Sequence, residues 1–259
     1  MNPKFHPAPD DDPFEGMKIG NWMILDDIDE RSSCSKCGKS RKYFCYTCYI
    51  AVDELQSRIP KVKLPVKVDI IKHAREIDGK STAAHAAILA PDDVKIYTYP
   101  DIPHYEEEEK VVLVYPGKAA STIEELFIQP RSANSNVLDD TKSTWSITEG
   151  SLPVTRAVFI DSTWNQSRGI YKDPRLRALP CVILQSRLSQ FWRHQKGSPR
   201  WYLATVEAIH QFLVELVIAS SSSYDGEFDS LLFFFRYMYS KIHSLYPNRD
   251  LRAYKRPIK

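Results

Sequence analysis

The feature that most constrains the fold is the stretch 155–184, in which two short apolar runs flank a polar segment. Residues 157–160 and 181–184 are apolar, and the first run is too short and too rich in β-branched and aromatic residues to be a helix. Ser162 and Thr163 are helix N-cap types, and residues 165–171 can form about two turns. A strand, a helical crossover and a strand predict a parallel sheet.

Asp161 comes directly after the first of these strands, at its carboxyl end. Ligands of open α/β sheets bind in the crevice beyond the carboxyl ends of the strands. We therefore expect Asp161 to take part in chemistry, with Thr163 and Trp164 beside it. The same residues also fit an ordinary helix cap followed by a core tryptophan, so the local pattern leaves both interpretations open.

A second strong pattern lies in residues 34–48, where two C-x-x-C pairs are separated by seven residues. Four thiolates with this spacing are typical of a structural zinc site, formed here by Cys34, Cys37, Cys45 and Cys48. Basic and aromatic residues fill the loop between the pairs. They fit a nucleic-acid contact and, equally, a mini-core that balances thiolate charge.

Length and composition predict one main domain with a small module. The chain has 259 residues, of which 43% are hydrophobic and 26% charged. We expect a disordered or loosely ordered tail over 1–31, a zinc-knuckle module over 32–60, and a catalytic domain over 61–259 with an insertion loop at 129–151. No apolar run approaches the ~18 residues of a membrane helix, so we expect no membrane association and a cytoplasmic or nuclear location.

The net charge of +2 argues neither for nor against nucleic acid, so that question depends on local clusters. The densest cluster is residues 185–200, in which basic side chains surround Phe191 and Trp192, a combination that suits RNA. Elsewhere we expect strands over 62–71, 94–99 and 111–115. We expect a helix over 83–89 that is capped by Ser81 or Thr82. A second helix should begin at Thr205, which caps it, and a third should span about 229–245.

Several blocks taken together resemble the DTW-domain family of tRNA-uridine aminocarboxypropyltransferases, and most closely a eukaryotic branch of it. The blocks are the cysteine pairs, Lys72-His73 with 79–82, 97–100, 115–117, Asp161-Ser-Thr-Trp164 with Gln166, 191–197 and 205–208. The resemblance implies a SPOUT-like α/β fold, with a parallel sheet and a C-terminal knot. It also implies S-adenosylmethionine as co-substrate, tRNA as partner and a nuclear location; protein partners are not indicated.

The resemblance also implies roles for individual residues. Asp161 would be the general base that removes the N3 proton of a uridine. The adenosine part of the co-substrate would lie against Tyr115, Pro116, Gly117, Leu184, Gln185 and Arg187, and its amino-acid part against Thr205 and Glu207. Glu207 equally fits a structural role in the first turn of a helix. The expected RNA contacts are Arg168, Arg193, His194, Lys196 and Arg200.

Two other functions fit much of the same pattern. An RNA methyltransferase of the same fold would need the same co-substrate and similar basic surroundings. A non-catalytic, zinc-dependent RNA-binding protein would use only the cysteine module and the basic loops.

Overall fold

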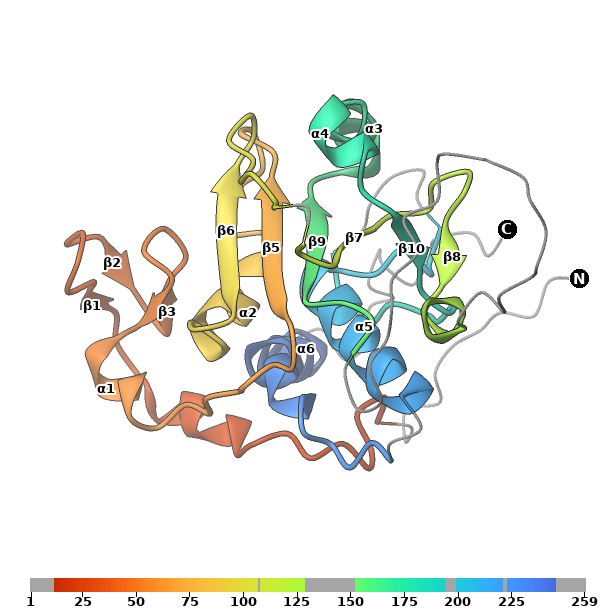
Figure 1. The fold of residues 1–259 in the computed structure, drawn as a ribbon. Coiled ribbons are helices and arrows are strands. Elements are labelled where there is room, and N and C mark those ends of the chain that lie inside the picture. The colour runs from red at the N-terminus through yellow and green to blue at the C-terminus, as the bar shows by residue number, and fades with distance from the viewer. Residues whose placement is uncertain (1–11, 107, 129–151, 194–198, 221–222, 246–259) are drawn as a thin grey trace, which may run out of the picture.

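The fold is built around a parallel sheet of six strands in the order β6-β5-β9-β7-β10-β8 (Figure 1). A computed structural model describes residues 12–106, 108–128, 152–193, 199–220 and 223–245, and the expected insertion loop at 129–151 lies outside them. The strands are β5 (Lys67–Lys72), β6 (Val94–Thr98), β7 (Val111–Val114), β8 (Ser121–Thr122), β9 (Arg156–Asp161) and β10 (Cys181–Ile183).

The parallel sheet predicted from residues 155–184 is confirmed, although the two strands on which the prediction was based, β9 and β10, are not neighbours. β9 pairs with β5 and β7, and β7 lies between β9 and β10. The expected strand over 62–71 is shorter than predicted. Residues 62–66 form no ladder because the Asp93 carboxylate binds this segment instead, accepting hydrogen bonds from the Leu64 N–H (2.9 Å) and the Lys63 ammonium (2.8 Å).

Helices cover both faces of the sheet. Successive strand residues point to opposite faces, and both faces carry apolar side chains that the helices bury. In β9, Ala157 and Phe159 join the larger core cluster, whereas Val158 joins the smaller one. The larger cluster lies under α2 (Ala83–Leu89), α5 (Thr205–Ala219), η3 (Asp229–Leu232) and α6 (Phe233–Leu245). The smaller one lies under α3 (Trp164–Tyr171) and α4 (Pro174–Arg177).

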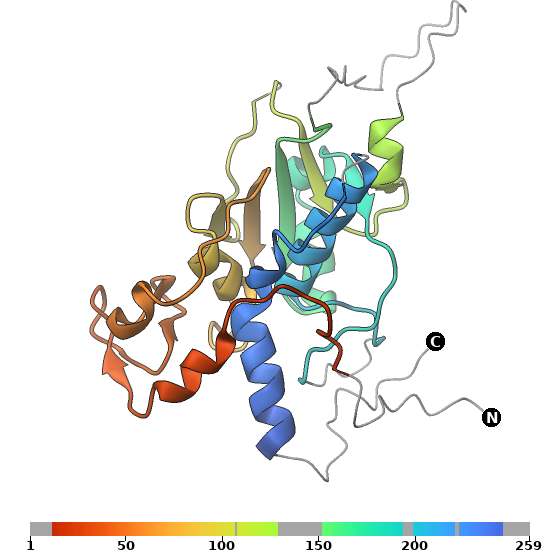
Figure 2. The ribbon, with the colours of Figure 1, turned by 90° about the horizontal axis from the view of Figure 1, so that it is seen from below.

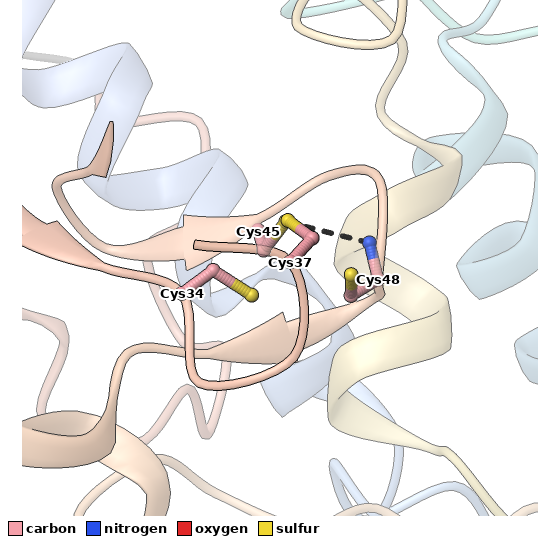
Figure 3. Close-up of side chains that lie close together, drawn as sticks. All are labelled: Cys34, Cys37, Cys45 and Cys48. Carbon is pink, nitrogen blue, oxygen red and sulfur yellow. Dashed lines mark hydrogen bonds between the residues drawn. The ribbon is translucent and has the colours of Figure 1, made fainter. Parts of the chain in front are cut away.

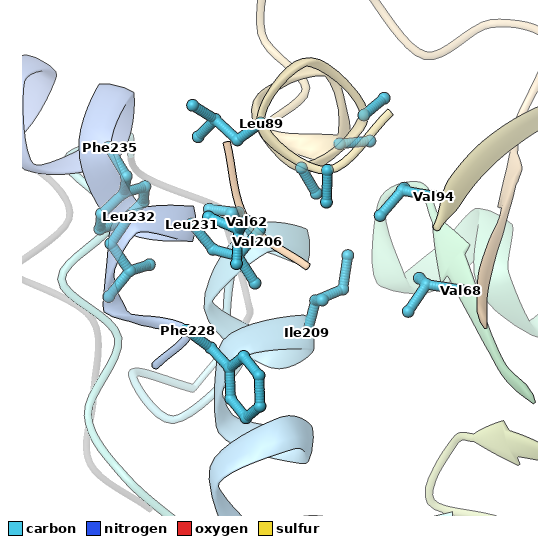
Figure 4. Packing of buried hydrophobic residues seen from close by; sticks show 14 of the residues in the cluster. Val62, Val68, Leu89, Val94, Val206, Ile209, Phe228, Leu231, Leu232 and Phe235 are labelled. Carbon is cyan, nitrogen blue, oxygen red and sulfur yellow. The ribbon is translucent and has the colours of Figure 1, made fainter. Parts of the chain in front are cut away.

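The larger core joins segments that are far apart in the sequence. Figure 4 shows Val206 and Ile209 of α5 among Val62, Leu89 and Leu231. Along the apolar stripe of α5, Val206, Ile209, Phe212, Leu213 and Leu216 are all 0% exposed, whereas Val217 is only partly buried. No helix of the described residues is long and apolar enough to cross a membrane.

Residues 12–31 do not form the loose tail that we expected. Phe14, Leu25 and Ile28 are buried, and η1 (Trp22–Asp27) packs against α6 (Figure 2). The reason is that this segment carries apolar and aromatic side chains that complete the outer face of α6. The Arg236 guanidinium, for example, lies 4.7 Å from the ring centre of Trp22. Residues 1–11 lie outside the described part of the chain.

The cysteine module follows as two small antiparallel sheets and one helical turn. Its elements are β1 (Ser32–Ser33), β2 (Ser40–Arg41), β3 (Phe44–Cys45), β4 (Ile50–Ala51) and α1 (Asp53–Gln56); η2 (Glu124–Phe127) lies later in the chain. Phe44 attaches the module to the main core, with its ring centre 4.7 Å from that of Phe234 and 5.4 Å from that of His85.

Candidate functional site

A cavity of about 970 Å³ lies where the carboxyl ends of β7, β9 and β10 meet the N-terminal ends of α2 and α5. Its walls include residues 114–116 at the carboxyl end of β7, 160–164 at that of β9 and 182–186 at that of β10. This is the position that the strand-end rule predicts for a ligand of a parallel sheet. Asp161 lies in its wall, as the sequence led us to expect.

The Asp161 carboxylate is buried, with 5% of the residue exposed, and two hydroxyl groups hold it. Ser81 Oγ donates a hydrogen bond to Oδ2 at 2.7 Å, and Thr205 Oγ1 donates to Oδ1. Burial raises the pKa of Asp161, and this effect outweighs the two hydroxyl donors and the charge of Lys72, which lower it. A fixed carboxylate with a raised pKa is suited to accepting a proton.

Ser81 is a site residue that the sequence suggested only as a helix cap. The N-cap of α2 is Thr82, and Ser81 Oγ accepts a hydrogen bond from Ala83 N at 3.1 Å while its hydroxyl hydrogen goes to Asp161. The adjacent Thr82 accepts a bond from Val206 N at 3.2 Å, which joins the starts of α2 and α5. The sequence signal for Ser81 was the Gly-Lys-Ser-Thr stretch at 79–82. This stretch does not match a phosphate-binding loop, because Ala74 stands where that motif needs its first glycine.

Thr163 and Trp164 lie in the cavity wall beside Asp161. Thr163 is the N-cap of α3, where Gln166 Oε1 accepts hydrogen bonds from its backbone N–H (3.2 Å) and its hydroxyl (2.9 Å). The Trp164 ring lies 4.0 Å, centre to centre, from that of Tyr202. Tyr202 and the neighbouring Trp201 were not singled out from the sequence, although both follow the predicted basic-aromatic stretch and both line the cavity.

Five of the eight residues predicted to hold the co-substrate line the cavity: Tyr115, Pro116, Leu184, Gln185 and Thr205. Gly117, Arg187 and Glu207 do not. A Cβ at Gly117 would lie 2.9 Å from Tyr171 Oη and 3.2 Å from Cys181 Sγ, so this glycine permits close packing on α3 and β10 in place of an approach to a ligand. Arg187 points toward α5, where it donates a hydrogen bond to Glu207 O at 3.2 Å.

Glu207 is structural in this fold. It is 2% exposed, and its oxygens accept hydrogen bonds from Ser189 Oγ (2.6 Å), Gln190 N (2.8 Å) and Ala204 N (2.8 Å). It therefore caps α5 and fixes residues 189–191 against it. The expectation that Thr205 is the cap is wrong, because Ala204 is the N-cap and the Thr205 hydroxyl is directed to Asp161.

The residues predicted to contact RNA do not all lie at the cavity. Arg193 lines the cavity, and Arg168 is exposed on α3 outside the cavity wall. Arg200, expected to contact a phosphate or the exposed uridine, is only 4% exposed and does not line the cavity. His194 and Lys196 lie outside the described residues.

The four cysteines of the two C-x-x-C pairs converge on one point (Figure 3). Their Sγ atoms all lie within 4.8 Å of one another, and those of Cys37 and Cys45 are 3.6 Å apart. Zinc–sulfur bonds of ~2.3 Å in a tetrahedron place sulfurs about 3.8 Å apart, so the cluster fits a zinc ion. Burial opposes ionisation of Cys45, but the nearby Arg41 guanidinium and the backbone N–H groups of Cys48 and Thr47 lower the pKa of its thiol to about 6.

Fold and site together define a ligand-binding α/β protein whose aromatic-lined cavity surrounds a buried carboxylate, with a cysteine cluster suited to a metal at its N-terminal side. The chain belongs to the DTW-domain family, whose sequence profile matches residues 42–243.

Curated relatives span most of the chain. The tRNA-uridine aminocarboxypropyltransferase 1 of Mus musculus is 43% identical over 256 residues, covering 90% of this chain and 84% of the relative. The protein of that name from Homo sapiens is 41% identical with the same coverage, and that from Xenopus tropicalis is 39% identical over 89% of this chain and 86% of its own length. No solved structure matches.

Proposed function

We propose that this protein transfers the 3-amino-3-carboxypropyl group of S-adenosylmethionine to N3 of a uridine in tRNA. The observation that carries the proposal is a buried, hydroxyl-bound Asp161 in the wall of a large cavity, in a chain of a family whose curated relatives are named for this reaction. A SPOUT-like topology with a knotted C-terminal part and a structural zinc ion at the four cysteines belong to the same proposal.

The cavity fits a nucleoside-type donor and a second base. Its volume of about 970 Å³ lies at the upper end of the ~300–1,000 Å³ typical of ligand sites. Tyr115, Pro116, Leu184 and Gln185 would hold the adenosine part, and the rings of Trp164 and Tyr202 offer faces on which a uracil exposed from the tRNA can stack. Arg193 lies at the start of the segment we expect to contact the RNA.

Asp161 is the group that makes the uridine reactive. When bound, S-adenosylmethionine supplies the electrophilic γ-carbon and a sulfur that leaves as methylthioadenosine. Asp161 takes the N3 proton while the N3–carbon bond forms and the carbon–sulfur bond breaks, with its electron pair going to sulfur. Ser81 and Thr205 keep the carboxylate oriented toward the cavity during this transfer.

The product identifies the reaction. Purified protein incubated with tRNA and S-adenosylmethionine should yield methylthioadenosine and an aminocarboxypropyl nucleoside on mass spectrometry of digested tRNA. S-adenosylhomocysteine in its place would mean an RNA methyltransferase and would refute the proposal. The Asp161→Asn variant should bind tRNA normally and leave it unmodified; tRNA binding without modification by the wild-type protein would favour a non-catalytic RNA-binding protein.

A further inference from the structure

Two side chains of opposite charge, Glu76 and Lys80, line the cavity from the loop that joins β5 to α2. Successive turns shape this loop, with Glu76 N donating to His73 O (2.9 Å) and Lys80 N to Ile77 O (2.7 Å). In the described part of the chain neither side chain forms an ion pair, whereas Asp78 between them pairs with Lys72. Within the described residues the cavity therefore has a negative and a positive group without a close ion-pair partner, although the charges of Lys80 and Lys72 both act on Glu76 and lower its pKa.

The remaining charges of the cavity wall already have other roles. The charged residues that line it are Glu76, Lys80, Asp161 and Arg193. Asp161 is bound by two hydroxyls, and Arg193 precedes the segment expected to meet RNA. Burial and the negative charge of Asp161 raise the pKa of Glu76, so a cationic group placed beside these two carboxylates is favoured.

We propose that Glu76 and Lys80 bind the two charges of the donor's amino-acid end, Glu76 the α-ammonium and Lys80 the α-carboxylate. This inference rests on the proposed function and assigns the subsite for the amino-acid end of the donor. Glu207 is not available for that subsite, because its oxygens accept hydrogen bonds from Ser189, Gln190 and Ala204. The transferred group carries both charges on one carbon, two bonds from its reactive carbon. A clamp in the same wall as Asp161 therefore keeps that carbon near the base.

The test is calorimetric binding of three compounds to the full-length protein without tRNA. S-adenosylmethionine has both charges, decarboxylated S-adenosylmethionine has only the ammonium, and methylthioadenosine has neither. Lys80→Met should weaken binding of S-adenosylmethionine about ten- to a hundredfold and leave the other two unchanged. Glu76→Gln should weaken both compounds that carry the ammonium and leave methylthioadenosine unchanged.

Arg75→Met is the matched control, because it removes a charge from the same loop at an exposed residue outside the cavity wall. It should bind all three compounds as the wild-type protein does. Equal affinity of the Lys80→Met protein for S-adenosylmethionine, or equal weakening of all three compounds, would overturn the clamp. Failure of the wild-type protein to bind S-adenosylmethionine at all would instead overturn the proposed function, so the two failures are distinct.

Discussion

Replacing Thr205 by valine tests how the site sets the charge of Asp161. Thr205 Oγ1 donates a hydrogen bond to Asp161 Oδ1, and valine has nearly the same shape without a donor. That bond stabilises the ionised form of the carboxylate, so its loss raises the pKa of Asp161 further. Only the ionised form can accept the N3 proton, and the acidic limb of the pH–rate profile should therefore move to higher pH.

The size of the effect follows from the kind of bond that is removed. A hydrogen bond to a charged group contributes about 1.5–3 kcal/mol, and each ~1.4 kcal/mol changes an equilibrium tenfold. On the acidic limb the transfer rate should fall by roughly one to two powers of ten. At alkaline pH, where Asp161 is ionised in both proteins, the two rates should converge.

The assay is the initial rate of methylthioadenosine formation with saturating tRNA and S-adenosylmethionine across the pH range. Thr205→Ser is the matched control because it retains the hydroxyl, and its profile should follow that of the wild-type protein. Ser81→Ala, which removes the donor to the other carboxylate oxygen, should shift the limb in the same direction. Identical profiles for the valine and serine variants would refute the assignment of Asp161 as the base.

Three further predictions concern the cysteine cluster and two glycines, Gly38 and Gly117. Cys37→Ser should lose bound zinc in metal analysis, whereas Cys181→Ser, outside the cluster, should keep one equivalent; full zinc retention in the first variant would contradict the metal site. Gly38→Ala should lower the free energy of unfolding by about 1–2 kcal/mol through its positive φ of 67° alone, since nothing lies within 4 Å of the added Cβ; an unchanged denaturation midpoint would contradict this. Gly117→Ala should destabilise by about 1–3 kcal/mol because its Cβ meets Tyr171 Oη, and adding Tyr171→Phe should restore part of the loss; no restoration would mean that another contact causes the strain.

Local patterns predicted most elements of the fold but not the order of the strands. The apolar run of β9, the crossover helix α3 and the buried stripe of α5 are each encoded within a few residues. The insertion of β7 between β9 and β10 depends on pairing between segments about 40 residues apart or more, which no local period records. The same applies to η1, whose apolar residues show their purpose only against α6.

The candidate site divides in the same way. Asp161 was predictable because a polar residue directly after a buried strand has a known position in a parallel sheet. Ser81 and Thr205 were not predictable as its partners, because they reach it from the starts of two helices more than 120 residues apart along the chain. Glu207 fits a helix cap and a ligand contact equally well by sequence; only the donors at Ser189, Gln190 and Ala204 decide between these roles.

The cysteine module is connected to the cavity more closely than its separate sequence pattern suggests. Both C-x-x-C turns end in a left-handed residue whose N–H donates to the first cysteine's carbonyl at 2.8 Å, but the residue is Gly38 in one turn and Tyr49 (φ 55°) in the other. A tyrosine in that conformation costs about 1–2 kcal/mol relative to glycine.

The charge of Lys72 acts on the Tyr49 hydroxyl group, lowering its pKa against the larger effect of burial, and the same charge acts on Asp161. The neighbouring Tyr46 ring lies against Gly79, 3.5 Å from where a Cβ would be, in the loop that carries Ser81. Removal of the metal should therefore disturb the environment of Asp161 as well as the module itself.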